Sequence, residues 1–353
     1  MNAPVRVLVT GVGGTLGQAI IKALCLADMP LEINGCDAVQ DSVGAAFVKT
    51  LHRVPLASDP AYVEVIDAIC EKNGYSAVLP STEQEIAILG GTASPPQLPS
   101  GAVVICHEAQ FFNTFSDKLS CARALAQEVN IGQFADGADA GEVQKLVAEA
   151  GFPLVVKPRR GSGSRILRIV NNWESLHDAL AEVPLPFVQE HFEDDLGEFS
   201  AGVFACEHFD AVLAFRRELC GEGCSMKAET SDDATVADYC RQIGGAMCLS
   251  GAANVQVRKT RTGVRLLEVN VRFSSLVAAR AAAGFRDAEW WLRLRLGMHT
   301  PTPPGRYRHL RFERYFHDLV DFGDGFQAVS EWSPRQQPLP GLLRDAIKPG
   351  DLD

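Results

Sequence analysis

Apolar runs and amphipathic segments alternate over the first hundred residues of the chain. Val5 to Val9 is a continuous apolar run, and the segment after the next turn repeats apolar residues at helical spacing, at Leu16, Ile20, Ile21 and Leu24. Further segments of the same two kinds are Leu31 to Cys36, the helical face of Tyr62, Ile66 and Ile69, and Ala77 to Leu79. Strands that alternate with helices predict a doubly wound α/β unit.

The glycine-rich turn in this unit, Thr10 to Gly17, allows a different function. Gly11, Gly13 and Gly17 are followed by Asp37, an acid 20 residues beyond the last glycine. This spacing suits a dinucleotide-binding fold. An NAD-dependent oxidoreductase is therefore the main alternative from another reaction class, although no Tyr-x-x-x-Lys pair follows along the chain.

A hairpin is expected in the second half of the chain. Ala253 to Lys259 is an apolar strand, and a second strand begins near Leu266. Gly263 in the loop between them suits the positive φ of a tight turn. If the hairpin is symmetric about Thr262, the side chain of Gln256 lies opposite that of Glu268.

This hairpin carries a cluster of oxygen donors. Glu268 and Asn270 lie two residues apart on a strand and therefore point to the same face. Together with Gln256 they form the hard ligand set that Mg²⁺ prefers when nucleotide phosphates complete its shell. Arg272 follows on the same face as a permanent cation. The alternative is an amphipathic hairpin with polar residues on its solvated side.

A second hairpin combines a lysine with a glycine-containing loop. Gly151 to Val170 consists of an apolar strand that ends in Lys157, the loop Gly161 to Ser164, and a strand of alternating character. Backbone amides in such a loop can approach phosphate oxygens, and the lysine adds a charge. The sequence is not a Walker A motif, and a plain hairpin turn is the alternative.

Taken in order, these segments resemble the ATP-grasp superfamily, most closely the branch of the carbamoyl phosphate synthase large chain and its stand-alone relatives. The resemblance runs from about Phe112 to Phe285. The closing signature of the family is glutamate, any residue, asparagine, proline and arginine. It matches Glu268, Asn270 and Arg272, with Val271 in place of the usual proline.

The resemblance implies a role for each matching residue. The residues implied to hold ATP are Lys118, Lys157, Gly161, Ser162, Gly163 and Ser164 at the phosphates, Glu190 and Phe192 in the segment that lines the adenine, and Glu198 at the ribose hydroxyls. The residues implied to bind Mg²⁺ or Mn²⁺ are Gln256, Glu268 and Asn270. Lys227 is expected at the γ-phosphate and Arg272 at the transferring phosphoryl group. Arg216 or Arg217 is left open as a contact of an acidic substrate.

The resemblance also implies the fold. An N-terminal doubly wound, Rossmann-like pre-ATP-grasp domain over residues 1–111 precedes a two-subdomain α+β ATP-grasp fold. Its small lid subdomain is expected over residues 112–187 and its large subdomain over residues 188–305. Residues 306–353 form a C-terminal extension, in which Arg306 to Tyr315 is expected to add one or two strands.

The composition of the chain argues against nucleic acid and membranes as binding partners. The 353 residues are 46% hydrophobic and carry a net charge of −11, which disfavours nonspecific binding to nucleic acid. No apolar run is long enough to cross a membrane, and the first residues lack the features of a signal peptide, so we expect a cytoplasmic protein. Cys220 and Cys224 stand close together, but their spacing is not that of a usual zinc site.

These patterns lead to one expected activity. We expect an ATP-dependent carboxylate–amine ligase that makes an acyl phosphate from a small carboxylate, transfers the acyl group to an amine and releases ADP and phosphate. A homodimer is left open. The alternatives are a carbamoyl phosphate synthase-like kinase acting on bicarbonate or carbamate, the NAD-dependent oxidoreductase, and a nucleotide-binding module without catalysis.

Overall fold

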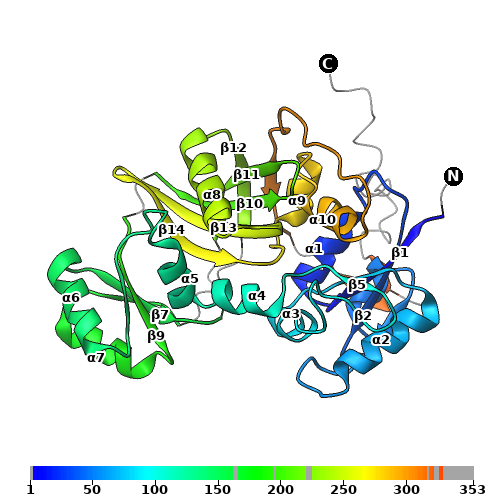
Figure 1. The fold of residues 1–353 in the computed structure, drawn as a ribbon, viewed down its shortest axis with the longest axis horizontal. Coiled ribbons are helices and arrows are strands. Elements are labelled where there is room, and N and C mark those ends of the chain that lie inside the picture. The colour runs from blue at the N-terminus through cyan, green and yellow to red at the C-terminus, as the bar shows by residue number, and fades with distance from the viewer. Residues whose placement is uncertain are drawn as a thin grey trace.

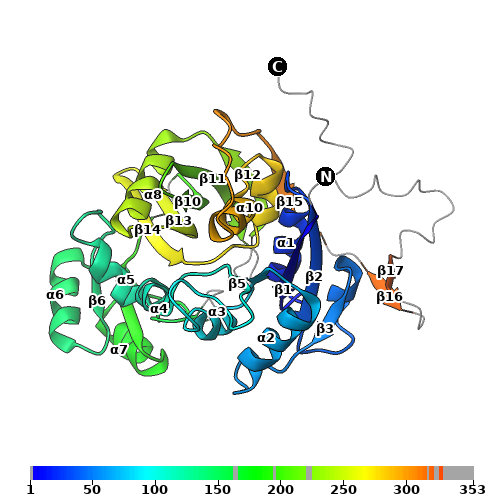
Figure 2. The same cartoon turned by 45° about the vertical axis from the view of Figure 1, so that its right-hand side comes forward.

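Three sheets of four or more strands follow one another along the chain in the computed structural model (Figure 1). The structure describes residues 3–161, 166–193, 196–219, 225–315, 318–321 and 326–328. We call the three sheets, in chain order, the front sheet, the small sheet and the large sheet. A separate hairpin of β16 (Leu319–Asp321) and β17 (Phe326–Ala328) lies beside the front sheet (Figure 2).

The front sheet is parallel, with the strand order β3-β2-β1-β4-β5. Its elements are β1 (Val5–Thr10), α1 (Thr15–Leu24), β2 (Leu31–Asp37), the 3-10 helix η1 (Val43–Phe47), β3 (Leu51–Arg53), α2 (Tyr62–Asn73), β4 (Ala77–Leu79), α3 (Glu83–Leu89) and β5 (Val103–Val104). Val7 and Val9 pack in the same core as Ile20 of α1, whereas Leu8 packs with Ile66 of α2. Helices on both faces confirm the doubly wound unit.

The glycine-rich turn after β1 is filled by the protein itself. The amide of Gly13 donates to Asp37 Oδ2 at 2.7 Å, and the amide of Val39 donates to Asp37 Oδ1 at 2.9 Å. A Cβ at Gly17 would lie 2.4 Å from the Gly11 carbonyl oxygen, so the glycine lets α1 pack closely against the turn. Asp37 therefore holds the turn instead of facing a ribose, which argues against the NAD-dependent oxidoreductase.

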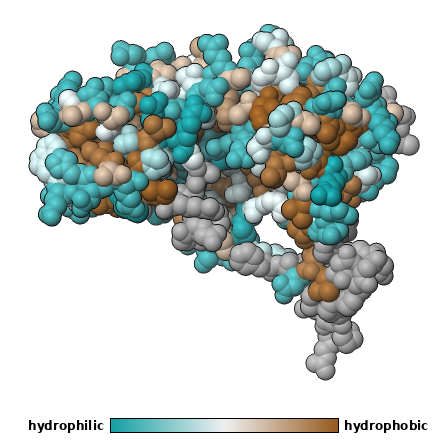
Figure 3. All heavy atoms as spheres, turned by 90° about the horizontal axis from the view of Figure 1, so that it is seen from below, coloured by the Kyte–Doolittle hydropathy of each residue, from teal (hydrophilic) through white to brown (hydrophobic). Residues whose placement is uncertain are grey.

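The small sheet is antiparallel, with the order β6-β9-β7-β8. Its strands are β6 (Phe134–Asp136), β7 (Leu154–Pro158), β8 (Arg168–Val170) and β9 (Pro186–Glu190), and α4 (Ala109–Ser116) and α5 (Lys118–Leu125) lead into it. Helices α6 (Ala140–Ala150) and α7 (Trp173–Glu182) pack on one face. Apolar side chains gather on the surface of this part of the molecule, at the left in Figure 3.

The large sheet is also antiparallel, with the order β14-β13-β10-β11-β12-β15. Its strands are β10 (Glu198–Ala205), β11 (Asp210–Leu219), β12 (Ser225–Ser231), β13 (Gly251–Thr260), β14 (Gly263–Asn270) and β15 (Arg311–Glu313). Helix α8 (Ala234–Ala246) covers one face. Helices α9 (Val277–Ala282) and α10 (Asp287–Arg295) cover the other face and pack against α1 of the front unit.

The architecture agrees with the expected α/β fold class. A parallel doubly wound sheet precedes a small and a large antiparallel sheet, and β15 supplies one of the closing strands expected between Arg306 and Tyr315. The four-unit division of the chain stays a prediction. Among the described residues, no helix combines the length and apolar character needed to cross a bilayer.

Candidate active site

The hairpin of β13 and β14 aligns the expected oxygen donors through a β-bulge. Thr260 pairs with Gly263 across a two-residue loop, and Gly263 has a φ of 124°. From this loop the register would place Gln256 opposite Leu267. Instead Gln256 pairs with Glu268, because the register shifts next to Gln256 and leaves Leu267 as the extra residue. The expected pair is therefore confirmed, although the simple symmetry that predicted it omits the bulge.

Lys157 reaches this bulge from the small sheet. Its ammonium donates to the Leu267 carbonyl oxygen at 2.9 Å and to Gln189 Oε1 at 3.1 Å. Gln189 also donates to the Leu266 carbonyl oxygen at 3.1 Å. Burial lowers the pKa of Lys157 to about 8; the nearby charge of Lys118 acts in the same direction and that of Glu268 opposes it. No signal in the sequence indicated that the Gln189 side chain contacts the other hairpin, because the residue lies in an apolar strand.

Lys118 joins the loop of the small sheet to the proposed metal strand. Its ammonium lies 3.4 Å from Glu268 Oε1 and donates to the Gly161 carbonyl oxygen at 2.9 Å. The lysine is the first residue of α5, whose N-cap Asp117 accepts from the amide of Ser120 at 3.0 Å. Glu268, Lys118 and Lys157 thus meet where α5, the small sheet and the large sheet converge.

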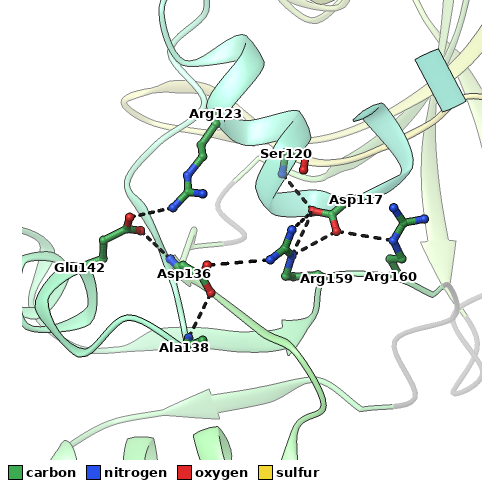
Figure 4. Close-up of polar contacts among 8 residues, drawn as sticks. All are labelled: Asp117, Ser120, Arg123, Asp136, Ala138, Glu142, Arg159 and Arg160. Atoms are coloured by element: carbon green, nitrogen blue, oxygen red, sulfur yellow. Dashed lines mark hydrogen bonds and ion pairs between the residues drawn. The ribbon is translucent and has the colours of Figure 1, made fainter. Parts of the chain in front are cut away.

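The carboxylate of Asp117 also anchors the residues that lead into the loop (Figure 4). Arg159 Nε donates to both Asp117 oxygens at 3.1 Å, and Arg160 Nε lies 3.6 Å from Asp117 Oδ2. Burial alone would raise the pKa of Asp117, but the Ser120 amide and the Arg159 guanidinium outweigh it and lower the pKa. Arg159 also lies 3.8 Å from Asp136 of β6, so the start of the loop is tied to both α5 and the small sheet.

A small recess brings together the next group of residues. It is lined by Glu83, Phe112, Ser116, Gly161 and the strand end from Glu268 to Arg272. Arg272 does not point into open solvent. Its Nε and Nη2 donate to Glu83 Oε1 at 3.1 Å and 2.9 Å, and Nη1 donates to the Phe273 carbonyl oxygen. The front unit therefore contributes a carboxylate, Glu83, that sequence reasoning missed.

A known family matches part of the chain. The family described as "ATP-grasp in the biosynthetic pathway with Ter operon" matches residues 187–315, which run from β9 through β15. An N5-carboxyaminoimidazole ribonucleotide synthetase, solved as its ADP complex, superposes with a TM-score of 0.69 at 14% identity, covering 88% of this chain and 82% of that chain. Residues 187–315 therefore match an ATP-grasp family, and the chain has the ATP-grasp fold.

Other solved structures resemble this chain over similar lengths. The biotin carboxylase domain of the Hydrogenobacter thermophilus 2-oxoglutarate carboxylase, with MgADP, ADP and bicarbonate, has a TM-score of 0.67 at 13% identity, covering 87% of this chain and 73% of that chain. The L-amino acid ligase from Bacillus licheniformis has a TM-score of 0.63 at 17% identity, covering 84% and 75%. No curated protein sequence matches. Placement in the carbamoyl phosphate synthase branch stays a prediction.

Two of the predicted site residues, Glu198 and Gln256, already accept hydrogen bonds from arginines. Both oxygens of Glu198 are taken, Oε1 by Arg217 and Oε2 by Arg258 Nη2 at 2.8 Å. Arg217 Nη2 also donates to Gln256 Oε1 at 2.8 Å. The side chains of Glu198 and Arg217 are only 13% and 7% exposed. Glu198 at a ribose and Gln256 at a metal therefore stay predictions, and each requires Arg217 to give up a contact.

The linker after β9 is held by side-chain and backbone contacts. Glu190 Oε2 accepts from the amide of Gln133 at 3.0 Å. The Phe192 ring packs over Gly132, where a Cβ would lie 2.7 Å away, and the Phe192 carbonyl oxygen accepts from Arg258 Nη1 at 2.9 Å. These residues line the edge between the two ATP-grasp sheets, and their contact with adenine stays a prediction.

The structure does not bring Lys227 to this site. Directly paired residues share a face, so Glu198, Arg217 and Ala228 lie on the face that carries Gln256 and Glu268. Lys227, next to Ala228, points to the opposite face and is exposed. Lys227 at the γ-phosphate therefore stays a prediction that its strand face does not support, and a position in a loop-like segment could not reveal that face. Arg216 is exposed on that opposite face as well.

Three of the proposed loop residues, Ser162, Gly163 and Ser164, lie outside the described residues, as do Cys220 and Cys224. Gly161 is described, with a φ of 108°, and its carbonyl oxygen binds Lys118. Within the described ranges, no group of three or more His, Cys, Asp or Glu side chains is placed to hold a metal.

Proposed function

We propose that this protein is an ATP-dependent, ADP-forming ligase that joins a small carboxylate to an amine through an acyl phosphate. One observation carries the proposal: Lys118, Lys157, Glu268, Asn270 and Arg272 converge at the junction of the front unit, the small sheet and the large sheet. Cations and oxygen donors gathered at one junction are suited to phosphoryl transfer, in which catalysis is mainly positioning and stabilisation of charge.

The nucleotide is expected between the small and large sheets. Val155 and Ile169 pair across β7 and β8 on the face that carries Lys157, and Ile169 is 53% exposed. This apolar surface next to a cation suits a base on one side and phosphates on the other. Lys118 and Lys157 would then lie at the phosphates, and Glu190 and Phe192 at the edge of the base.

The residues present fit Mg²⁺ with one adjustment. Glu268 and Asn270 offer a carboxylate and an amide oxygen from one strand, the hard donors that Mg²⁺ prefers. Gln256 would join them once Arg217 releases its oxygen. When bound, the ion would offset the negative charge of the phosphates.

The chemistry would proceed in two displacements. A carboxylate oxygen of the first substrate attacks the γ-phosphorus, and the bond from that phosphorus to ADP breaks, leaving an acyl phosphate. Lys118, Lys157 and Arg272 offset the negative charge on the transferring group. The nitrogen of the amine then attacks the acyl carbon, phosphate leaves, and the nitrogen loses a proton. The small sheet closes over the site and keeps water from the acyl phosphate.

A kinase or carboxylase that acts on bicarbonate is the second candidate. It is supported by the biotin carboxylase domain that was solved with MgADP and bicarbonate and that shares this fold. In such an enzyme the first displacement would be the same, with bicarbonate as the carboxylate. The two candidate activities differ only in the substrates that must be present for the enzyme to release ADP.

A release assay separates these activities. ADP and phosphate are measured with ATP and Mg²⁺ over a panel of amino acids and other small carboxylates, alone, in pairs and with bicarbonate. ADP that appears only with a carboxylate and an amine together supports the ligase. ADP that appears with bicarbonate alone supports the second candidate. Release of AMP, or binding of NADH as tight as that of ATP, would contradict both.

A further inference from the structure

We propose that Glu83 binds the ammonium group of the acceptor, so that the amine substrate of this enzyme is a primary amine that arrives as a cation. The inference rests on the proposed function, because it assigns the amine site of that ligase. It adds a residue of the front unit to a site otherwise built from the two ATP-grasp sheets.

Glu83 lies beside the expected site of phosphoryl transfer. Glu83 is the first residue of α3, and its side chain is 35% exposed. It lines the same recess as Gly161, Glu268 and Asn270. The carboxylate is held there by two hydrogen bonds from Arg272, at 3.1 Å and 2.9 Å. A front-unit carboxylate therefore faces the place where the transferring phosphoryl group is expected.

Positive and negative side chains are balanced in the recess before a nucleotide binds. The recess and its rim hold two carboxylates, Glu83 and Glu268, which are paired with Arg272 and Lys118. When ATP brings its phosphates and metal, Arg272 and Lys118 gain stronger partners in the phosphate oxygens, and Glu268 turns to the metal. Glu83 would then be a partly buried carboxylate without its cation, which a new cationic partner would stabilise.

An ammonium group meets this requirement. It has three donors and a compact positive charge, so it can replace the guanidinium on Glu83 beside the acyl phosphate. An ammonium has no lone pair, so it gives one proton to the Glu83 carboxylate before its nitrogen attacks the acyl carbon, and the nitrogen loses a second proton as phosphate leaves. The first substrate is a carboxylate, which Glu83 would repel. The same side chain therefore keeps the two substrates in separate positions, with the amine on the side of the front unit.

The test compares two acceptors of equal size. Hydroxylamine is uncharged at neutral pH, whereas methylamine is present as the ammonium, and both trap an acyl phosphate. kcat/KM for each is measured with ATP, Mg²⁺ and the best carboxylate of the release assay, for the wild type, Glu83→Gln and Glu83→Asp. Glu64→Gln, an exposed glutamate on α2 of the same unit, is the matched control.

The expected result is a change in the ratio of the two acceptors. Loss of a hydrogen bond to a charged group should lower kcat/KM for methylamine relative to hydroxylamine by about tenfold or more in Glu83→Gln, with partial recovery in Glu83→Asp and no change in the Glu64→Gln control. A ratio that stays constant overturns the proposal, because a residue acting only through Arg272 would slow both acceptors alike.

Two other results have a defined meaning. Glu83 is not an ammonium site if the wild type uses hydroxylamine but not methylamine. The same holds if Glu83→Gln raises the Mg²⁺ concentration needed for half-maximal rate while the reactions with both acceptors slow in parallel. If the wild type releases ADP with no carboxylate and forms no hydroxamate, the proposed function itself fails, and the inference falls with it.

Discussion

Lys157 is the residue through which pH should act on nucleotide binding. Burial, together with the charge of Lys118, lowers its pKa to about 8, so the free enzyme loses this cation as the pH rises through that value. We expect kcat/KM for ATP to fall on the alkaline side with an apparent pKa near 8, since kcat/KM reports the ionisation of the free enzyme.

A pH profile of kcat/KM for ATP checks this expectation. Lys157→Arg is the matched variant, because arginine keeps its charge throughout this range. Its activity will be lower, but its profile should lack the alkaline limb. A wild-type profile that stays flat well above pH 8 would show that Lys157 does not supply charge to the phosphates.

Glu198 has a structural task in addition to its predicted contact with ribose. Glu198→Ala leaves Arg217 and Arg258 without their shared carboxylate in a largely buried place. We expect the free energy of unfolding to fall by about 2 to 4 kcal/mol and the KM for ATP to rise, with little effect on the KM of the acceptor. Denaturant titration and steady-state kinetics measure the two effects.

A surface ion pair supplies the control for Glu198. Glu182→Ala removes the partner of Arg168 on the exposed side of the small sheet and should change stability by less than about 1 kcal/mol. If Glu198→Ala lowers the free energy of unfolding no more than this control does, Glu198 does not stabilise the two arginines in the folded protein. If stability falls while the KM for ATP stays constant, the ribose contact is wrong.

At the scale of elements, the hairpin of β13 and β14 shows what local sequence can and cannot reveal. The apolar run and Gly263 predicted the strands and the turn, because these features depend on neighbours in the chain. The bulge at Leu267 has no such signal. It exists where the Leu267 carbonyl oxygen accepts from Lys157, a residue of another sheet. The face on which Lys227 lies had no local signal either, since the face of a strand is set by pairing across the sheet.

The small sheet is the element expected to move. It contacts the large sheet through polar groups such as Lys157 and Gln189, which can exchange their partners for phosphates when the sheet closes over a nucleotide. We expect hydrogen exchange of peptides covering β7, the loop after it and β8 to slow when Mg²⁺ and a nonhydrolysable ATP analogue are added.

Peptides from α8 serve as the reference for this experiment, because that helix packs on the far face of the large sheet. Their exchange should not change. Unchanged exchange in β7 and β8 would mean that the loop from Gly161 is only a turn. Slowing of equal size in α8 would indicate a general gain in stability instead of closure.

At the scale of the whole molecule, the candidate site exists only where three units meet. Glu83 comes from the front unit, Lys157 from the small sheet and Glu268 from the large sheet. The sequence predicted the segments that carry Lys157 and Glu268, and the family resemblance named these two residues, but nothing in the sequence pointed to Glu83 at the start of α3. It could not predict that Arg272 binds Glu83 or that Arg217 takes the oxygen of Gln256, because both contacts depend on how distant segments pack.

The central claim is that these units form an ATP site around Glu268, and Glu268→Gln tests it most directly. The change keeps the shape of the side chain and removes the charge that would offset the metal. We expect the free energy of unfolding to change by less than about 1 kcal/mol, while ATP turnover with a carboxylate and an amine falls by about a hundredfold or more. A folded Glu268→Gln protein with wild-type ATP turnover would contradict the account.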